Sequence, residues 1–389
     1  MTRIAHSMNK SYLTLIASML VTFVLGSVHA FSVFIVALET LLQLPRSEIS
    51  LIYSFALVSI TFSVLLGYRI YSVVPAWLLV GITCLVAASG LMVAANAENW
   101  WTLFLGYSLL FGISNGVGYG FTLQLVAREM PSIKGFAMGA VTAAYAVGSI
   151  VFAKIFASRI SSSSITSAFT ALALALLVCA LVVGLLMYFS KAKYRSADSA
   201  KKKLSQSPQI RKVLLFWLAY MFSVFAGLMA IGHAAGIALS KGASDQLSVW
   251  SAMMIGVGSA GGGFLVGWLV DRWPIRRFLI GLPLISAISL LLLSMVELPF
   301  LVITLLFLVG FAYGSIIAIY PVAISNYFLE QGPKVYGRVF TAWGFAGLVA
   351  PWTAGLIYDS QSSYQLALIV ASLTALLSAI TVKFSQFEK

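Results

Sequence analysis

The sequence predicts an all-α integral membrane protein in which 12 transmembrane helices form two pseudo-symmetric six-helix bundles. The first observation is composition: 61% of the 389 residues are hydrophobic and 9% are charged, with a mean hydropathy of +1.00. Soluble domains are about 45–50% apolar and about 25% charged, so a water-soluble enzyme is excluded. The second observation is the spacing of the charged residues, and the third is one long polar segment near the middle of the chain.

Each predicted helix is a stretch without Asp, Glu, Lys or Arg that is long enough to cross a bilayer. About 20 helical residues span the roughly 30 Å hydrocarbon core. The shortest of the 12 stretches has 19 residues, and the sequence lacks the short alternating segments of a β-barrel. The stretches are 11–38, 49–68, 70–97, 99–127, 135–153, 160–190, 213–240, 246–270, 278–296, 298–329, 339–358 and 360–382.

The basic residues predict that both termini lie in the cytoplasm. With the amino terminus inside, 20 of the 24 Lys and Arg residues fall on the inner side, and the outer side keeps Arg46, Lys154, Arg159 and Lys241. This asymmetry follows the positive-inside rule and predicts a multi-pass protein of the cell membrane, the cytoplasmic or inner one. The net charge of +13 is therefore a topology signal, and because the charges are scattered over loops we expect no nucleic-acid partner.

The polar segment divides the chain into two halves. Residues 191–212 are rich in Lys, Ser and Gln and predict a flexible cytoplasmic linker between an amino-terminal bundle, 1–190, and a carboxy-terminal bundle, 213–389. The halves echo each other at an offset of about 200 residues, since Gly67 matches Gly267 and His29 matches His233. Internal duplication is typical of transporters that rock one bundle against another around a midplane site.

The loop after the eighth stretch carries the most specific motif. It reads Gly267-Trp-Leu-Val-Asp271-Arg272-Trp-Pro-Ile-Arg276-Arg277 and resembles the G-x-x-x-D-R-x-x-x-R-R loop of the major facilitator superfamily. Gly267 would permit close helix approach, and Asp271 would accept bonds from helix amides and from Arg, so we expect this loop to gate the cytoplasmic side. The plainer alternative is a basic loop that only obeys the positive-inside rule.

Longer strings are similar to the oxalate/formate antiporter family, which is close to the monocarboxylate transporters. The resemblance covers nearly the whole chain and implies a major facilitator fold that moves small carboxylates by alternating access. The strings are HAFSVFIVALETLLQLPRSEIS, SNGVGYGFTLQLVAREMPSIKGFAMG, FWLAYMFSVFAGLMAIGHAAG and YPVAISNYF…VYGRVFTAWGFAGLVAPWTAGLIYDSQSSYQLAL.

The chain departs from the oxalate-binding members of that family at two positions, and from the major facilitator loop motif at a third. The oxalate-binding members carry an Arg in the eighth span and a Lys in the eleventh, where this chain has Gly263 and Trp343. Because burying an anion without a partner is costly, this departure argues against oxalate as the solute. Trp343 could stack on a monoanionic or apolar solute, or pack between helices. In the first inner loop Tyr71 stands where the acid of the motif would be, which predicts an asymmetric inner latch.

Titratable side chains within the spans are candidates for function because they are costly in lipid. His29 and His233 lie at similar depths in the first and seventh stretches. Either could line the cavity and take up a proton or bond a carboxylate; the alternative is a neutral His bonded to a backbone carbonyl. Lys154, near the outer face, could attract an entering anion or snorkel to the headgroups.

Polar and aromatic residues at helical spacing supply further candidates for solute binding, although such residues also pack between helices. They are Asn115, Tyr119 and Gln124 in the fourth stretch and Tyr313 and Tyr320 in the tenth. Two other patterns predict packing alone. Gly116-x-x-x-Gly120 is a close-packing signal, and Cys84 and Cys179, each a lone thiol in an apolar run, should behave as small hydrophobic residues.

We therefore expect a secondary transporter for a small organic anion, a monocarboxylate first, driven by a proton or by exchange and working as a monomer. The sequence carries no recognised motif for catalysis, a metal or a cofactor, and we expect no enzyme activity. Two alternatives stay open. One is a carrier or exporter of a neutral amphipathic molecule, which the missing cations favour, and the other is a membrane sensor on a carrier scaffold that does not transport.

Overall fold

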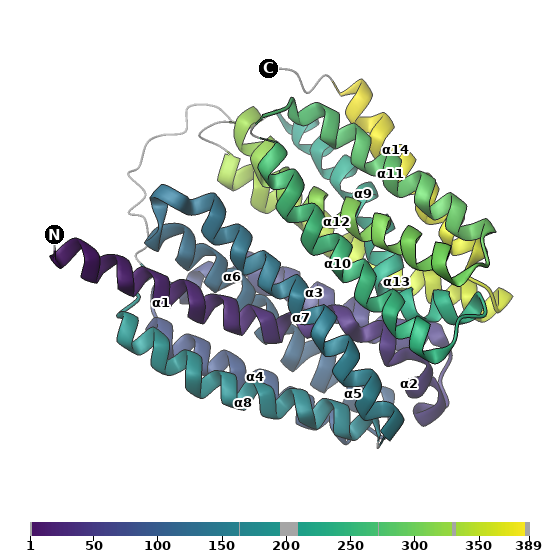
Figure 1. Ribbon diagram of the computed structural model, residues 1–389, viewed down its shortest axis with the longest axis horizontal. Coiled ribbons are helices and arrows are strands. Elements are labelled where there is room, and N and C mark those ends of the chain that lie inside the picture. The colour runs from purple at the N-terminus through teal and green to yellow at the C-terminus, as the bar shows by residue number, and fades with distance from the viewer. Residues whose placement is uncertain (1, 163, 195–208, 271, 329–331, 386–389) are drawn as a thin grey trace. The chain divides into compact units, whose positions relative to one another are not determined.

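The predicted all-α, membrane-spanning architecture is confirmed in the computed structural model, which describes residues 2–162, 164–194, 209–270, 272–328 and 332–385 (Figure 1). Within these ranges the chain is helical apart from short connections and contains no strand. Twelve helical spans in the same ranges are long and apolar enough to cross a membrane. They correspond one to one with the twelve predicted charge-free stretches.

The first six spans are built from helices that are interrupted at two places. The first span joins α1 to the 3₁₀ segment η1, and the fourth joins α5, the π-helical segment η2 and α6. The helices are α1 Thr2–Leu25, η1 Gly26–Val33, α2 Ile35–Leu42, α3 Arg46–Tyr71, α4 Ala76–Ala95, α5 Trp100–Leu103, η2 Phe104–Phe111, α6 Gly112–Glu129, η3 Pro131–Ile133, α7 Lys134–Ser162 and α8 Ile165–Ser190.

The last six spans are one helix each. Three of these helices contain an internal proline, namely α11, α12 and α13. Their bounds are α9 Ile210–Ser240, α10 Asp245–Leu269, α11 Ile275–Met295, α12 Pro299–Phe328, α13 Gly332–Gln361 and α14 Gln365–Phe384.

The helices group into two compact units. One unit contains Met1–Val28 and Phe55–Lys202, and the other contains His29–Ser54 and Lys203–Lys389. The second unit therefore holds the last six spans together with the end of span one, all of α2 and the first residues of α3. This short segment of the first half has its packing partners in the second half of the chain.

Glycines set the spacing of α10 and α12, which lie side by side in the second unit (Figure 1). A Cβ added at Gly262 would lie 2.2 Å from the backbone oxygen of Phe311, and one added at Gly314 would lie 2.0 Å from the backbone oxygen of Ser259. Since real Cβ atoms do not approach backbone so closely, only glycine permits this interface. Small residues at crossings are how membrane helices gain van der Waals contact in the absence of a hydrophobic driving force.

Two packing predictions for the first unit are confirmed. A Cβ at Gly116 would lie 2.4 Å from the oxygen of Ile60, so the close approach predicted from the Gly116-x-x-x-Gly120 pattern is confirmed. Cys84 of α4 and Cys179 of α8 are buried free thiols, as expected of small hydrophobic residues, and the two side chains are neighbours. Figure 1 shows α4 and α8 side by side along their length.

Candidate functional site

In the first unit, Asn115 of α6 lies at the centre of a buried polar cluster. Its Nδ2 donates to the backbone oxygen of Leu25 at 2.6 Å, and its Oδ1 accepts from the hydroxyl of Tyr145 on α7 at 3.0 Å. Tyr119, one turn further along α6, contacts the Tyr145 ring with centroids 5.0 Å apart and lies 3.4 Å from the Thr142 hydroxyl. The structure therefore brings the predicted candidates Asn115 and Tyr119 together and adds Tyr145, which the sequence pattern did not single out.

The position of Asn115 explains why span one can change its helical type within the membrane. Leu25 is the last residue of α1, and η1 begins at Gly26. Irregular backbone at membrane depth requires partners for its polar groups, because lipid offers none. The Asn115 amide provides one for Leu25, and the Tyr107 hydroxyl donates to the oxygen of Val28 at 3.4 Å. Asn115 therefore has a positioning role in the fold, whether or not it also contacts a solute.

Gln124 belongs to a different cluster. Its Oε1 accepts from the Tyr194 hydroxyl at 2.7 Å, and the guanidinium of Arg128 lies 4.0 Å above the Tyr194 ring. Tyr71, the residue in place of the motif acid, is fully buried with its ring 5.5 Å from that of Tyr194. The side chain of Gln124 thus anchors the start of the predicted linker. It does not join Asn115 and Tyr119, because four- and five-residue steps turn it onto another face of α6.

In the second unit, Trp343 and Tyr313 form a buried aromatic pair. The indole Nε1 of Trp343 on α13 donates to the Tyr313 hydroxyl on α12 at 2.8 Å, and the Trp343 ring stacks on Phe340 at 5.7 Å. Tyr313 fits because Gly227 of α9 leaves room, since a Cβ there would lie 2.4 Å from Cδ2 of the tyrosine. Tyr320 has other partners: its ring lies 4.4 Å from that of Tyr220. The two candidate tyrosines of α12 therefore have separate partners, Trp343 for Tyr313 and Tyr220 for Tyr320.

The two histidines lie in the second unit and have different surroundings. His29, in η1, is partly buried, and its Nδ1 lies 2.8 Å from the hydroxyl of Tyr53. His233, on α9, is fully buried, with Nδ1 2.9 Å from the Tyr364 hydroxyl and Nε2 2.8 Å from the backbone oxygen of Pro351. Both ring nitrogens of His233 thus have protein partners, which favours the alternative of a neutral His bonded to a carbonyl.

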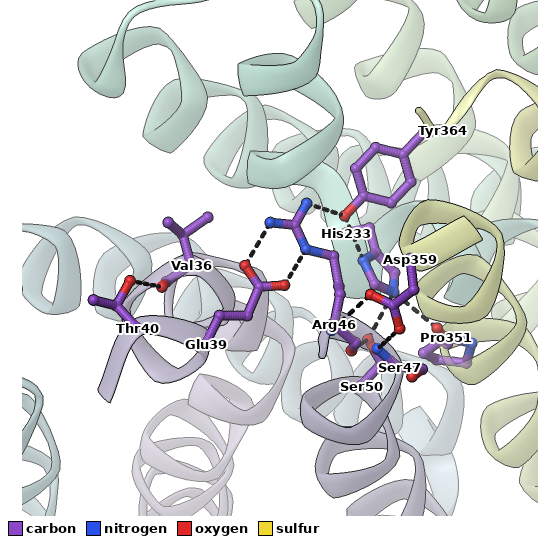
Figure 2. Close-up of polar contacts among 10 residues, drawn as sticks. All are labelled: Val36, Glu39, Thr40, Arg46, Ser47, Ser50, His233, Pro351, Asp359 and Tyr364. Carbon is purple, nitrogen blue, oxygen red and sulfur yellow. Dashed lines mark hydrogen bonds and ion pairs between the residues drawn. The ribbon is translucent and has the colours of Figure 1, made fainter. Parts of the chain in front are cut away.

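His233 is part of a charged network that sequence reasoning missed (Figure 2). Arg46, only 7% exposed, donates from Nε and Nη2 to the two carboxylate oxygens of Glu39, the second at 2.6 Å, and from Nη1 to the Tyr364 hydroxyl at 3.0 Å. Its guanidinium also lies 3.7 Å above the ring of Tyr358. We refer to Glu39, Arg46, His233, Asp359 and Tyr364 as the charged network. The sequence feature that could have indicated it is the presence of Glu39, Arg46 and Asp359 between predicted spans, because charged residues are scarce in this chain.

Asp359 ties the start of α3 into this network. Its Oδ1 accepts from the backbone N–H of Arg46 at 2.8 Å, and its Oδ2 accepts from the backbone N–H of Ser47 at 2.8 Å (Figure 2). The first amides of a helix have no partner within the helix, and a negative charge there also interacts favourably with the helix dipole. A carboxylate from the end of α13 thus caps a helix more than 300 residues away in the sequence.

The structure describes the predicted gating loop except for Asp271, which lies outside the described residues. The described residues do not support the expected close helix approach at Gly267, since a Cβ added there would meet none of their atoms within 4 Å.

Two arginines of the loop make hydrogen bonds to backbone oxygens, one within the loop's own helix and one to the last helix. Arg272 donates from Nη1 to the oxygen of Trp268 at 3.1 Å and stacks over that ring at 3.6 Å, and Arg276 donates from Nη2 to the oxygen of Lys383 at 3.0 Å. A gating role for these two and for Arg277 stays a prediction. Lys154 is exposed on α7, which is required both for attracting an anion and for reaching the lipid headgroups.

No metal site emerges from the described ranges, where no three His, Cys, Asp or Glu side chains are close enough to share an ion. The acids are also kept away from the middle of the membrane. The described spans contain four of them, Glu48, Glu129, Asp245 and Asp359, each within three residues of a span end.

Comparison with known proteins agrees with this architecture. The family model described as Major Facilitator Superfamily matches residues 14–332 and 216–386. An uncharacterized MFS-type transporter of Escherichia coli, YhjX, is 28% identical over 354 residues, covering 87% of this chain and 86% of that protein.

Solved transporters share the fold at low identity. The inward-open xylose transporter XylE from E. coli is 15% identical with a TM-score of 0.76, covering 97% of this chain and 96% of that chain. The nucleoside transporter NupG is 13% identical with a TM-score of 0.72, covering 97% of this chain and 100% of that chain. At these identities the likeness concerns the fold alone.

Proposed function

Because the chain belongs to the major facilitator superfamily, whose members move solutes by alternating access, we propose that it is a secondary carrier for a small organic anion. A monocarboxylate is the first candidate. We place the carrier in the cytoplasmic membrane, with both termini in the cytoplasm and a single chain as the working unit, on the asymmetry of the basic residues.

The observation that carries this proposal is the absence of carboxylates from the middle of the described spans. A buried acid would repel an anion, and a charge of the same sign at close range costs most where the dielectric constant is low. The polar groups at depth are instead hydrogen-bond donors: the hydroxyls of Tyr119 and Tyr145, the amide of Asn115 and the indole of Trp343. These donors bond protein acceptors in this structure, and a carboxylate that takes the place of those acceptors would regain the hydrogen bonds it loses with water.

We assign solute contact to two of these clusters. In the first unit it is the Asn115, Tyr119 and Tyr145 cluster, and in the second it is the Tyr313 and Trp343 pair. Both come from spans that carry no charged side chain at that depth. A single negative charge is easier to hold in such neutral surroundings than two, and this supports a monocarboxylate over a dicarboxylate.

The energy for accumulation is proposed to come from an ion gradient or from exchange, since the sequence has no phosphate-binding loop for a nucleotide. If a proton is the coupling ion, uptake rises as the external pH falls from about 7.5 to 5.5, the range in which an ordinary His titrates. An exchanger would instead respond to anion preloaded on the opposite side.

A second candidate is a carrier of a neutral amphipathic solute. The neutrality of the two clusters favours it, as does the replacement of the family's cations by Gly263 and Trp343. A sensor that does not transport is the third possibility. Labelled uptake separates the three.

The experiment uses the purified full-length chain in proteoliposomes. We expect uptake of labelled acetate or lactate, competition by other unlabelled monocarboxylates, and no competition by xylose. Uptake of labelled xylose without uptake of labelled acetate or lactate would favour the neutral solute, and no uptake of any of the three labels would favour the sensor. A matched control is the same liposome preparation without protein.

A further inference from the structure

The charged network joins the two halves of the sequence at one end of the spans. Glu39 and Arg46 follow the first span, Asp359 and Tyr364 lie at the connection of α13 and α14, and His233 lies on α9 (Figure 2). The loops after the first and eleventh spans are on the membrane side opposite to both termini, because each follows an odd number of crossings. With the termini in the cytoplasm, this is the outer side.

The hydrogen bonds define which atoms of His233 carry protons. The backbone oxygen of Pro351 only accepts, so Nε2, at 2.8 Å from it, must carry a hydrogen. That N–H also lies 3.3 Å from the hydroxyl oxygen of Ser50, whose own proton is donated to the oxygen of Arg46 at 2.6 Å. Nδ1 is then an acceptor, and its donor is the Tyr364 hydroxyl at 2.9 Å.

Tyr364 is suited to donate a hydrogen bond to Nδ1 of His233. Burial raises the pKa of its hydroxyl above the ordinary value of 10.0, and the positive charge of Arg46 offsets only part of that rise. The hydroxyl therefore keeps its proton at neutral pH and donates it to Nδ1, while its oxygen accepts from Nη1 of Arg46 at 3.0 Å. The hydrogen bonds that run from Arg46 through Tyr364 and His233 to Pro351 thus all point the same way. Each donor has an acceptor only if His233 is neutral.

A second proton on His233, at Nδ1, would disrupt these hydrogen bonds. Protonated Nδ1 would become a donor facing Tyr364, whose oxygen would then receive hydrogens from two cations, and the Tyr364 proton would lose its acceptor. The charged groups that face His233 are Arg46 from α3 and Asp359 from α13. Glu39 from α2 is paired with Arg46, and Tyr358 lies under the same guanidinium.

We propose that the charged network is an outer latch and that protonation of His233 opens it. The closed latch holds the start of α3 through Asp359 and Arg46, and the state that accepts the additional proton, taken up from the outer water at Nδ1, is the one in which these bonds are broken. Since a ligand shifts an equilibrium toward the state that binds it better, acid outside the cell favours release of the start of α3 from the end of α13. This rests on the proposed carrier function, in which such a release opens the path to the outside.

The size of the effect follows from the ordinary titration of histidine. If only the open latch binds the proton, with a pKa of about 6.5, lowering the pH from about 7.5 to about 5.5 raises the ratio of open to closed latch about tenfold.

Hydrogen–deuterium exchange of the full-length chain in lipid nanodiscs tests this without any solute. The backbone N–H groups of Arg46 and Ser47 are protected by Asp359 and exchange when the latch opens. After correction for the intrinsic pH dependence of exchange, we expect peptides covering them to exchange about tenfold faster at the lower pH. In His233→Gln the amide nitrogen can still donate to Pro351 and its oxygen can accept from Tyr364, so the latch forms but no longer titrates, and the tenfold change is lost.

Two further variants complete the test. His29→Gln replaces the other intramembrane histidine, which bonds Tyr53 and lies outside the latch, and it should keep the tenfold change. Tyr364→Phe removes the hydroxyl between Arg46 and His233 and should speed exchange already at the higher pH. An unaltered pH response in His233→Gln, or unaltered exchange in Tyr364→Phe, would overturn the proposal. Because no solute is involved, failure of the anion-uptake experiment does not imply failure here, and the reverse also holds.

Discussion

Replacement of Gly262 by Ala measures how tightly α10 and α12 are packed. The added Cβ would lie 2.2 Å from the backbone oxygen of Phe311, and the atom that must move is main chain and not the end of a flexible side chain. Overpacking of this kind costs about 1–3 kcal/mol. Gly261, the neighbouring residue on the same helix, is exposed, and a Cβ there would meet no atom within 4 Å, so Gly261→Ala is a matched control.

The control also removes the effect of helix propensity. Alanine favours a helix over glycine by about 1 kcal/mol, and this gain is common to both variants. The difference between them therefore reports packing, and we expect Gly262→Ala to be less stable than Gly261→Ala by about 1–3 kcal/mol. Reversible unfolding in mixed micelles of a mild detergent and SDS, followed by tryptophan fluorescence, gives both free energies of unfolding. Equal values for the two variants would refute the close approach of α10 and α12.

Three other outcomes are expected. Reporters fused at Lys202 and at Glu98 should report the cytoplasm and the outside respectively, and reversal of either would contradict the topology. Trp343→Phe removes the donor to Tyr313 while keeping an aromatic ring, so it should raise the KM for the solute and lower the free energy of unfolding by only about 0.5–1.5 kcal/mol; an unchanged KM would argue against solute contact. Asp271→Asn should strongly reduce transport in cells with normal membrane expression, and unchanged turnover would exclude a gating role for this acid.

The sequence was sufficient for the number and order of the spans, because the cost of charge in lipid confines Asp, Glu, Lys and Arg to their ends. The spacing of Gly116 and Gly120 also predicted a close helix contact, since three residues between glycines place both on one face. Gly267 shows the limit of such reasoning. A glycine in a matching motif indicates that a neighbouring helix can approach closely. Whether a helix does so depends on tertiary packing, which the motif does not determine.

The charged network could not be predicted in the same way. Arg46 and Asp359 are more than 300 residues apart, and each alone reads as an ordinary loop charge. Their connection depends on how α3 and α13 meet, which is a property of tertiary packing. The same is true of Gln124, whose partner Tyr194 lies beyond the sixth span. Span one carries no proline to mark its change to a 3₁₀ segment at Gly26, and the partner that satisfies Leu25 there, Asn115, comes from another span.

The central claim is that this chain carries a small monocarboxylate by alternating access, and counterflow tests it most directly. Proteoliposomes preloaded with unlabelled acetate or lactate are diluted into a trace of the same labelled anion. After releasing an unlabelled anion outside, the carrier binds a labelled anion there and transports it inward. The account therefore predicts that label inside the liposomes transiently exceeds its equilibrium level, and that this does not occur in protein-free liposomes. Label that only rises to equilibrium, at the same rate with and without preloading, would contradict it.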